Sequence, residues 1–152
     1  KQINNREPLT ITSKKMTRFV LTKEESVDLC MSALANMKGG EIFIQKMKSL
    51  KIEDLGSALI KEPNKIEWLT IGCKPGEKLH EELATELERD RIYLHNNLIV
   101  VLPEITDYLP FDAKENIKRI SSGLRLSDPI RSDAADLISI KEIRSLLETP
   151  TK

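Results

Sequence analysis

Three charged side chains, Arg18, Lys74 and Glu77, stand in sequence surroundings typical of ligand binding. Lys74 and Glu77 share the stretch Gly72-Cys73-Lys74-Pro75-Gly76-Glu77, which sets a cation, a tight turn and a carboxylate just before a predicted helix. Arg18 lies in Met16-Thr17-Arg18-Phe19, where apolar neighbours predict a strand, so its guanidinium is expected to project from a sheet edge or a pocket wall. The sequence therefore predicts a binding loop and a strand-borne cation.

Each of these residues, taken singly, also has a plain structural interpretation. Arg18 fits a solvated surface arginine, and Lys74 is one of 24 basic residues. Glu77 fits the first turn of a helix, where a carboxylate is stabilised by free amides and by the macrodipole. Only the combination favours a ligand site.

The elements that must position these residues begin with strands at Leu9–Ile11 and Thr17–Leu21, expected to form a small hairpin through Ser13–Lys15. A helix is expected to start at Thr22, because Thr22 and Glu25 have capping-box spacing. Its apolar residues recur at three- and four-residue spacing and are expected to form one buried stripe, which comprises Val27, Cys30, Met31, Leu34 and Met37. Gly39-Gly40 is expected to supply the left-handed stop.

The remaining pattern alternates strands and helices, which predicts an α/β fold with a small mixed sheet, a hairpin and several helices. Strands are expected at Glu41–Gln45, Ile66–Ile71, Ile92–Leu94 and Leu98–Leu102, the last two around the turn His95-Asn96-Asn97. Helices are expected from Ser49 to a break at Pro63-Asn64, from Lys78 towards Glu88, and over Ile140–Glu148 with Ser139 as cap. Residues 105–128 are expected to be irregular, and Ser127–Asp136 to be a loop.

Composition excludes several classes of partner. The 24 basic side chains are matched by 24 acidic ones and aromatics are only 4%, so neither a net field nor stacking platforms favour nucleic acid.

No apolar run approaches the roughly 18 residues that cross a bilayer, and no signal peptide is recognisable, so a cytoplasmic location is expected. Cys30 and Cys73 are expected to be plain thiols. The missing initiator Met and the helix-like start at Lys1 lead us to expect a fragment.

The residues that would carry catalysis, a cofactor or a metal are not found. Glycines at 39, 40, 56, 72, 76 and 123 form no Gly-x-Gly-x-x-Gly run for a dinucleotide. Tyr93 and Tyr108 are not followed by lysine at Tyr-x-x-x-Lys spacing. His80-Glu81 begins like a zinc-protease signature but places Ala84 where the second histidine belongs. No catalytic, cofactor-binding or metal-binding residue is therefore predicted.

An ordered series of motifs resembles a known family. Met16-Thr17-Arg18-Phe19, then Gly39-Gly40-Glu41-Ile42-Phe43, then Ile71-Gly72-Cys73-Lys74-Pro75-Gly76-Glu77-Lys78-Leu79-His80-Glu81-Glu82-Leu83 follow in this order. The series resembles the C-terminal, substrate-binding half of UDP-N-acetylglucosamine 4,6-dehydratases of the C5-inverting type, in the extended short-chain dehydrogenase/reductase superfamily. The likeness is strong over 1–103, taken as the nucleotide-sugar-binding region. It is looser over 104–152, taken as a loop-rich C-terminal extension with a terminal helix.

The resemblance implies different roles for the two halves of such an enzyme. The Rossmann half, absent here, would bind NADP and supply the catalytic residues of a lyase in polysaccharide biosynthesis, while this half closes over a UDP-sugar. Arg18 and Lys74 would meet the diphosphate, and Glu77 would accept hydrogen bonds from ribose hydroxyls. The family usually has arginine where Lys74 stands, and an ammonium cannot make the planar two-point contact of a guanidinium. Self-association is also implied.

Two other hypotheses stay open. The chain fits a stand-alone nucleotide-sugar-binding or interaction module without enzymatic activity, because the catalytic half is missing. It also fits a structural α/β domain in which Arg18, Lys74 and Glu77 form surface ion pairs of little energetic consequence.

Overall fold

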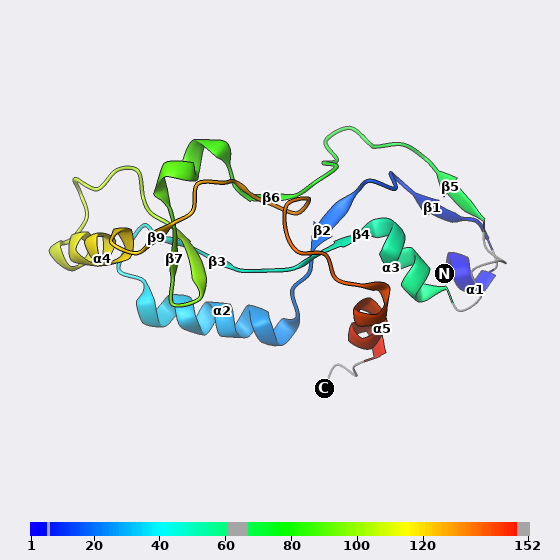
Figure 1. The fold of residues 1–152 in the computed structure, drawn as a ribbon, viewed down its shortest axis with the longest axis horizontal. Helices are drawn as coiled ribbons and strands as arrows, with labels where there is room; N and C mark the ends of the chain where they lie inside the picture. The colour runs from blue at the N-terminus through cyan, green and yellow to red at the C-terminus, as the bar shows by residue number, and fades with distance from the viewer. Residues whose placement is uncertain (6, 61–66, 149–152) are drawn as a thin grey trace. The chain divides into compact units, whose positions relative to one another are not determined.

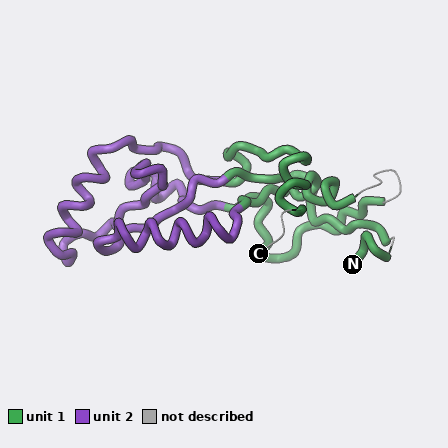
Figure 2. The backbone as a smooth tube through the Cα atoms, turned by 90° about the horizontal axis from the view of Figure 1, so that it is seen from below, with its two compact units in different colours: residues 1–20, 48–81, 132–152 green, residues 21–47, 82–131 purple. Residues whose placement is uncertain are grey.

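The computed structural model describes residues 1–5, 7–60 and 67–148. They form two compact units, coloured separately in Figure 2. Unit 1 comprises residues 1–20, 48–81 and 132–152, and unit 2 comprises residues 21–47 and 82–131. Each unit contains residues from both sides of position 103, so the two units do not coincide with the regions 1–103 and 104–152. That division of the chain stays a prediction.

The described residues of unit 1 form two separate strand pairs, and helices lie beside them (Figure 1). Strand β1 (Leu9–Ile11) pairs in parallel with β5 (Trp68–Thr70), and β2 (Thr17–Phe19) pairs antiparallel with β4 (Ser49–Lys51). The helices are α1 (Gln2–Asn5), α3 (Ile52–Leu59) and α5 (Ile140–Glu148). The core lies between α3, α5 and β4, and its buried members are Leu50, Ala58, Ile138 and Ile143.

Helix α3 approaches the β1–β5 pair at one glycine. A Cβ atom on Gly56 would lie 2.3 Å from Cη2 of Trp68 and 3.0 Å from Cδ2 of Leu9. Gly56 is buried, so only a residue without a side chain lets the helix backbone lie against the indole ring. This contact supports the strand that leads directly into the 71–81 loop.

Unit 2 is built on a four-stranded antiparallel sheet in the order β3-β8-β7-β9. These strands are β3 (Ile42–Gln45), β7 (Ile92–His95), β8 (Leu98–Val101) and β9 (Leu124–Arg125). A second pair joins β6 (Glu82–Ala84) to β10 (Ile130–Arg131). The remaining elements are α2 (Lys23–Asn36), the 3-10 helix η2 (Glu86–Arg91) and α4 (Phe111–Ser121).

The sheet of unit 2 carries apolar clusters on both faces, because successive side chains of a strand point to opposite sides. One cluster is formed by Ile44, Ala84, Ile92, Ile99 and Val101. The other is formed by Val100, Leu102 and Ile120, with Phe43, Tyr93 and Ile117 packed against it.

The mixed α/β class is confirmed, as are the elements with strong local signals. Thr22 and Glu25 form the predicted capping box at the start of α2. Ser139 caps α5, with its hydroxyl accepting from the Glu142 amide at 3.2 Å. The β7–β8 hairpin turns at Asn96 and Asn97, whose φ angles are 49° and 64°.

Several predicted pairings and caps are wrong. Residues 9–11 and 17–21 do not form a hairpin, because each strand pairs instead with a segment thirty or more residues away. Ser49 does not cap a helix: it is fully buried in β4, and α3 starts after Lys51. The end predicted at Pro63-Asn64 lies outside the described residues, as does Ile66, and α3 ends at Leu59.

The predicted helix from Lys78 towards Glu88 is also wrong. Residues 82–84 pair as β6 with β10, a segment that lies far along the sequence. A capping box between Thr85 and Glu88 then starts η2. Leu83 and Leu87 are 39% and 92% exposed, so these leucines do not form a buried helical face.

Two further expectations for unit 2 are contradicted. The apolar stripe of α2 is not buried, since Val27, Met31 and Leu34 are 60%, 62% and 66% exposed. Residues 105–128 are not irregular throughout, because they contain α4. The buried face of α4 includes Asn116, and a polar residue in that face weakens the apolar periodicity that sequence reasoning needs.

Candidate functional site

Lys74 and Glu77 lie on one tight turn of unit 1, in the segment 71–81 that follows β5. The Glu77 amide donates to the Lys74 carbonyl at 3.0 Å, and the Glu77 carboxylate accepts from the Lys74 amide at 3.1 Å. Gly72 and Gly76 have φ angles of 81° and 82°, which L side chains rarely adopt. The glycines thus allow the turn, and Glu77 closes it.

The end of β1 holds this turn in place. The Thr12 hydroxyl donates to Oε1 of Glu77 at 3.2 Å, across 65 residues of sequence. Each carboxylate oxygen of Glu77 therefore has one protein donor and keeps lone pairs for a ligand hydroxyl. Glu77 is partly buried, whereas Lys74 is exposed.

Arg18 is bound to the next residues of the same segment. Its Nη2 donates to the Lys78 carbonyl at 2.9 Å, and its Nη1 to the carbonyls of Thr17 and Leu79 at 2.7 and 3.3 Å. Its Nε lies 3.2 Å from Oε1 of Glu81. The side chain is 25% exposed. Arg18 thus anchors residues 78–81 through all three guanidinium nitrogens.

A buried hydroxyl network, which the sequence did not predict, lies beside Arg18. The Thr17 hydroxyl is 2.8 Å from Nδ1 of His80 and 2.7 Å from the Ser132 hydroxyl. The Ser132 hydroxyl accepts from the Glu81 amide at 2.8 Å. Thr17 and Ser132 are 4% and 0% exposed. The network therefore fixes the segment 78–81 against β2.

The same network is not arranged for nucleophilic catalysis. Both hydroxyls are buried and already bonded, so neither is open to a substrate. Asp133 lies 3.9 Å from Nε2 of His80, too far for a good hydrogen bond. Thr17 and His80 stand inside the motifs that sequence reasoning singled out, but nothing in the sequence marks Ser132, which lies 115 residues from Thr17.

The structure therefore brings Lys74 and Glu77 into one turn and ties Arg18 to Lys78, Leu79 and Glu81, which follow it. Within the described residues no group of three or more His, Cys, Asp or Glu side chains could hold a metal ion. Cys30 and Cys73 are exposed free thiols.

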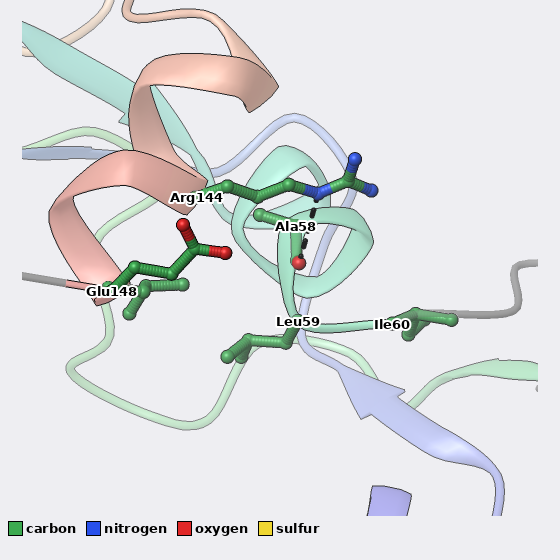
Figure 3. Close-up of a pocket in the computed structure, with 6 residues that line it drawn as sticks. Ala58, Leu59, Ile60, Arg144 and Glu148 are labelled. Carbon is green, nitrogen blue, oxygen red and sulfur yellow. Dashed lines mark hydrogen bonds between the residues drawn. The ribbon is translucent and has the colours of Figure 1, made fainter.

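A separate pocket of about 370 Å³ lies between α3 and α5 in unit 1 (Figure 3). Its lining residues are Ala58, Leu59, Ile60, Arg144, Leu147 and Glu148. Arg144 reaches across it from α5, and its Nε donates to the Ala58 carbonyl at 3.3 Å. None of the three predicted site residues lines this pocket.

The titratable groups Glu41, His95 and Glu142 have shifted pKa values. The Ser139 amide and hydroxyl, followed by Lys48, lower the pKa of Glu142 to about 2. Burial and the nearby Arg119 lower the pKa of His95. Burial alone would raise the pKa of Glu41, but hydrogen bonds led by the Gly39 amide hold it below its usual range. These groups lie outside the 71–81 turn.

In the parts of the chain that the structure covers, no helix has both the length and the apolar character to span a bilayer.

Comparison with known proteins finds a family model described as polysaccharide biosynthesis protein, which matches residues 1–103. The chain is 40% identical to an uncharacterized membrane protein of Methanocaldococcus jannaschii, over 78% of this chain and 42% of that protein. It is also 40% identical to a UDP-N-acetylglucosamine 4,6-dehydratase (inverting) of Campylobacter jejuni, over 64% of this chain and 28% of that enzyme.

Among solved structures, Pen from Bacillus thuringiensis is similar with a TM-score of 0.73 and 30% identity. The match covers 96% of this chain and 41% of the Pen chain. The chain thus spans less than half the length of each of these proteins.

Proposed function

Because this chain belongs to the family of polysaccharide biosynthesis proteins, we propose that it is the nucleotide-sugar-binding part of a nucleotide-sugar 4,6-dehydratase. The proposed substrate is UDP-N-acetylglucosamine, converted to a 4-keto-6-deoxy sugar for a surface polysaccharide or glycan. The name of the Campylobacter jejuni relative supports this choice. A cytoplasmic location and self-association of the complete lyase belong to the same proposal.

The turn that joins Lys74 to Glu77 carries the proposal. The exposed Lys74 ammonium would face the diphosphate, while Glu77 would accept from ribose hydroxyls. A carboxylate close to a diphosphate is repelled, so the two side chains must address different parts of one ligand. Glu77 is already oriented by Thr12 and by the Lys74 amide, which reduces the ordering cost of binding.

Arg18 has two roles in this proposal. Its contacts with the Lys78 and Leu79 carbonyls order the segment that follows the turn. Its partly exposed guanidinium would also meet the diphosphate as the second cation. A lysine at this position would keep the charge but lose the multiple contacts, so Arg18→Lys separates the two roles.

This chain does not fit NADP by itself. Its glycines form no closely spaced run that would let a backbone approach a pyrophosphate at a helix N-terminus. We therefore assign NADP, and every bond-making step, to a Rossmann half of the complete enzyme. The residues of this chain bind and orient the substrate.

The test is steady-state kinetics of the complete enzyme with UDP-N-acetylglucosamine. Lys74→Ala and Glu77→Gln are expected to raise KM about tenfold or more with kcat changed much less, because a charge-assisted hydrogen bond contributes about 1.5–3 kcal/mol. Lys14→Ala is the matched control, since Lys14 is an exposed lysine of the same unit paired with Glu53 at 3.0 Å. It should leave KM unchanged.

Unchanged KM in all the site variants would favour the structural hypothesis, in which these charges form surface ion pairs only. A stand-alone nucleotide-sugar module makes a different prediction for the isolated chain. UDP should then give localised, saturable chemical-shift changes around residues 72–77 without any other polypeptide. A binding part that needs its catalytic half should give none.

A further inference from the structure

Ser132 belongs to the region taken as a C-terminal extension, yet it contacts the segment that carries the binding motifs. The family model matches residues 1–103, so Ser132 lies outside the match. The Ser132 amide donates to the Glu81 carbonyl at 2.9 Å, and the Ser132 hydroxyl accepts from the Glu81 amide at 2.8 Å. One residue of the extension therefore holds both backbone groups of Glu81.

Backbone hydrogen bonds on its C-terminal side hold Ser132 in place. The Ser49 amide donates to the Asp136 carbonyl, and the Ile138 amide donates to the Ser49 carbonyl, each at 2.8 Å. Ile138 is 6% exposed and belongs to the core of unit 1. Ser132 therefore lies on a segment that is packed against this core.

Neighbouring oxygen atoms decide where the Arg18 guanidinium lies. Arginine has five N–H groups. In Arg18 the Nε group faces the Glu81 carboxylate, and Nη2 donates once, to the Lys78 carbonyl. Both Nη1 groups are used by the carbonyls of Thr17 and Leu79. The remaining N–H has no acceptor among the residues that the structure describes, and it is the one left for a ligand.

Thr17 connects Ser132 to this arrangement from β2. The Thr17 amide donates to the Leu79 carbonyl at 3.1 Å. Its hydroxyl lies 2.7 Å from the Ser132 hydroxyl and 2.8 Å from Nδ1 of His80. Thr17 and Ser132 are 4% and 0% exposed, so a lost bond is not replaced by solvent. Loss of either hydroxyl would therefore move the backbone carbonyls that orient Arg18.

We infer that Thr17 and Ser132 are positioning residues of the nucleotide-sugar site, an inference that rests on the proposed function. Neither touches the ligand, because both side chains are buried. They hold the acceptors of Arg18 so that its remaining N–H meets the diphosphate. The region 104–152 thus completes the substrate site of the region 1–103 instead of only extending it.

The experiment is steady-state kinetics of the complete enzyme with UDP-N-acetylglucosamine. Thr17→Val keeps the branched shape and removes the hydroxyl, whereas Thr17→Ser keeps the hydroxyl. Thr17→Val and Ser132→Ala should raise KM about fivefold or more with kcat changed much less, because complete loss of a charge-assisted hydrogen bond costs about tenfold or more in binding. Thr17→Ser should keep a KM close to that of the wild type. Equal KM values for Thr17→Val and Thr17→Ser would overturn the inference.

Ser49→Ala is the matched control, since Ser49 is a second fully buried serine of unit 1. Its hydroxyl has no hydrogen-bond partner in the described part of the chain. Ser49→Ala should leave KM unchanged. If both serine variants raise KM alike, a general loosening of the core explains the effect, and the inference is wrong. A Ser132→Ala protein with a lower Tm and an unchanged KM would also overturn it, because Ser132 would then be a structural residue only.

A double-mutant cycle tests whether Ser132 acts through Arg18. In an Arg18→Lys background, Ser132→Ala should have little further effect on KM, because the contacts that it supports are already lost. In a Lys74→Ala background its effect should persist, since Lys74 takes no part in the hydrogen bonds of Ser132. If the effects of Ser132→Ala and Arg18→Lys multiply in full, Ser132 does not act through Arg18, and the inference fails.

Equilibrium binding of UDP to the same variants separates this inference from the proposed function. UDP affinities that fall in the expected order, in an enzyme without turnover of UDP-N-acetylglucosamine, keep the positioning role and remove the dehydratase function. Turnover with unchanged KM in Thr17→Val and Ser132→Ala keeps the function and removes the positioning role. A wild-type enzyme that neither binds UDP nor turns over the sugar removes both.

Discussion

Replacing Gly56 by alanine is expected to destabilise unit 1, although alanine is the better helix former. The new Cβ would lie 2.3 Å from Cη2 of Trp68, whereas non-bonded carbon atoms settle about 3.5–4.0 Å apart. The obstructing atom belongs to a rigid indole ring, and Leu9 closes the second side at 3.0 Å. Helix α3 and strand β5 must therefore separate by more than an ångström, or the indole must change rotamer.

The two opposing contributions set the size of the effect. Alanine in place of a helix-interior glycine contributes up to about 1 kcal/mol of stability. Overpacking of a closely packed interior costs about 1–3 kcal/mol. The net loss is expected to be about 0.5–2 kcal/mol, which lowers Tm by several degrees for a unit of this size.

Trp68 makes the assay local, because it is the only tryptophan in the chain. Urea unfolding followed by tryptophan emission should show a lower midpoint for Gly56→Ala, with a native emission maximum that shifts as the indole environment opens. Ser57→Ala is the matched control in the same helix, and it should be neutral or slightly stabilising. In a Trp68→Phe background, followed by circular dichroism, the cost of Gly56→Ala should fall, because the clashing ring atom is gone.

A Gly56→Ala protein that is more stable than the wild type, with unchanged Trp68 emission, would refute this reasoning. Helix α3 would then not lie against the indole, and the support of the strand leading into the 71–77 turn would need a different explanation. A loss that is equally large in the Trp68→Phe background would locate the strain elsewhere.

Three further predictions concern the network beside Arg18, the cap of α5 and the β7–β8 turn. Ser132→Ala should cost about 1–3 kcal/mol in urea unfolding, since it removes the acceptor of the Glu81 amide; a cost near zero would mean that the network is dispensable. The pKa of Glu142 is lowered to about 2, so the cap should be at full strength above an unfolded value near 4.5 and be lost as pH falls towards 2. An NMR titration of Glu142 with a midpoint at the unfolded value would contradict this. Asn97→Gly should stabilise the hairpin by about 0.5 kcal/mol, because glycine adopts a φ of 64° without strain, and a lower Tm would speak against the turn geometry.

Short-range hydrogen bonding is what sequence reasoning predicted best. The capping boxes at Thr22 and Ser139 each close over three residues, so their partners are visible in the sequence. The same holds for the turn at Asn96-Asn97, whose positive φ angles suit asparagine. In each case the interacting residues are close in sequence, so their contacts do not depend on which distant segments pack together.

Sequence reasoning named the residues of the candidate site but did not predict their contacts. The glycine-flanked turn that carries Lys74 and Glu77 follows from local residue types. The bond from Arg18 to the Lys78 carbonyl spans 60 residues, and the bond from Thr17 to Ser132 spans 115. Neither hydroxyl nor guanidinium identifies its distant acceptor, because the same groups bond equally well to water.

The sequence by itself predicted the helix starts at Thr22 and Ser139 and the tight turns at residues 72–77 and 96–97. The diphosphate and ribose roles of Arg18, Lys74 and Glu77 stay predictions. Only the tertiary structure decided that β1 pairs with β5 and β2 with β4, because a three-residue strand has no preferred partner until other elements place one beside it. Only the tertiary structure decided which face of α2 packs, since its pattern allows two. Periodicity reports that an apolar face exists, but which body covers that face depends on contacts distant in sequence.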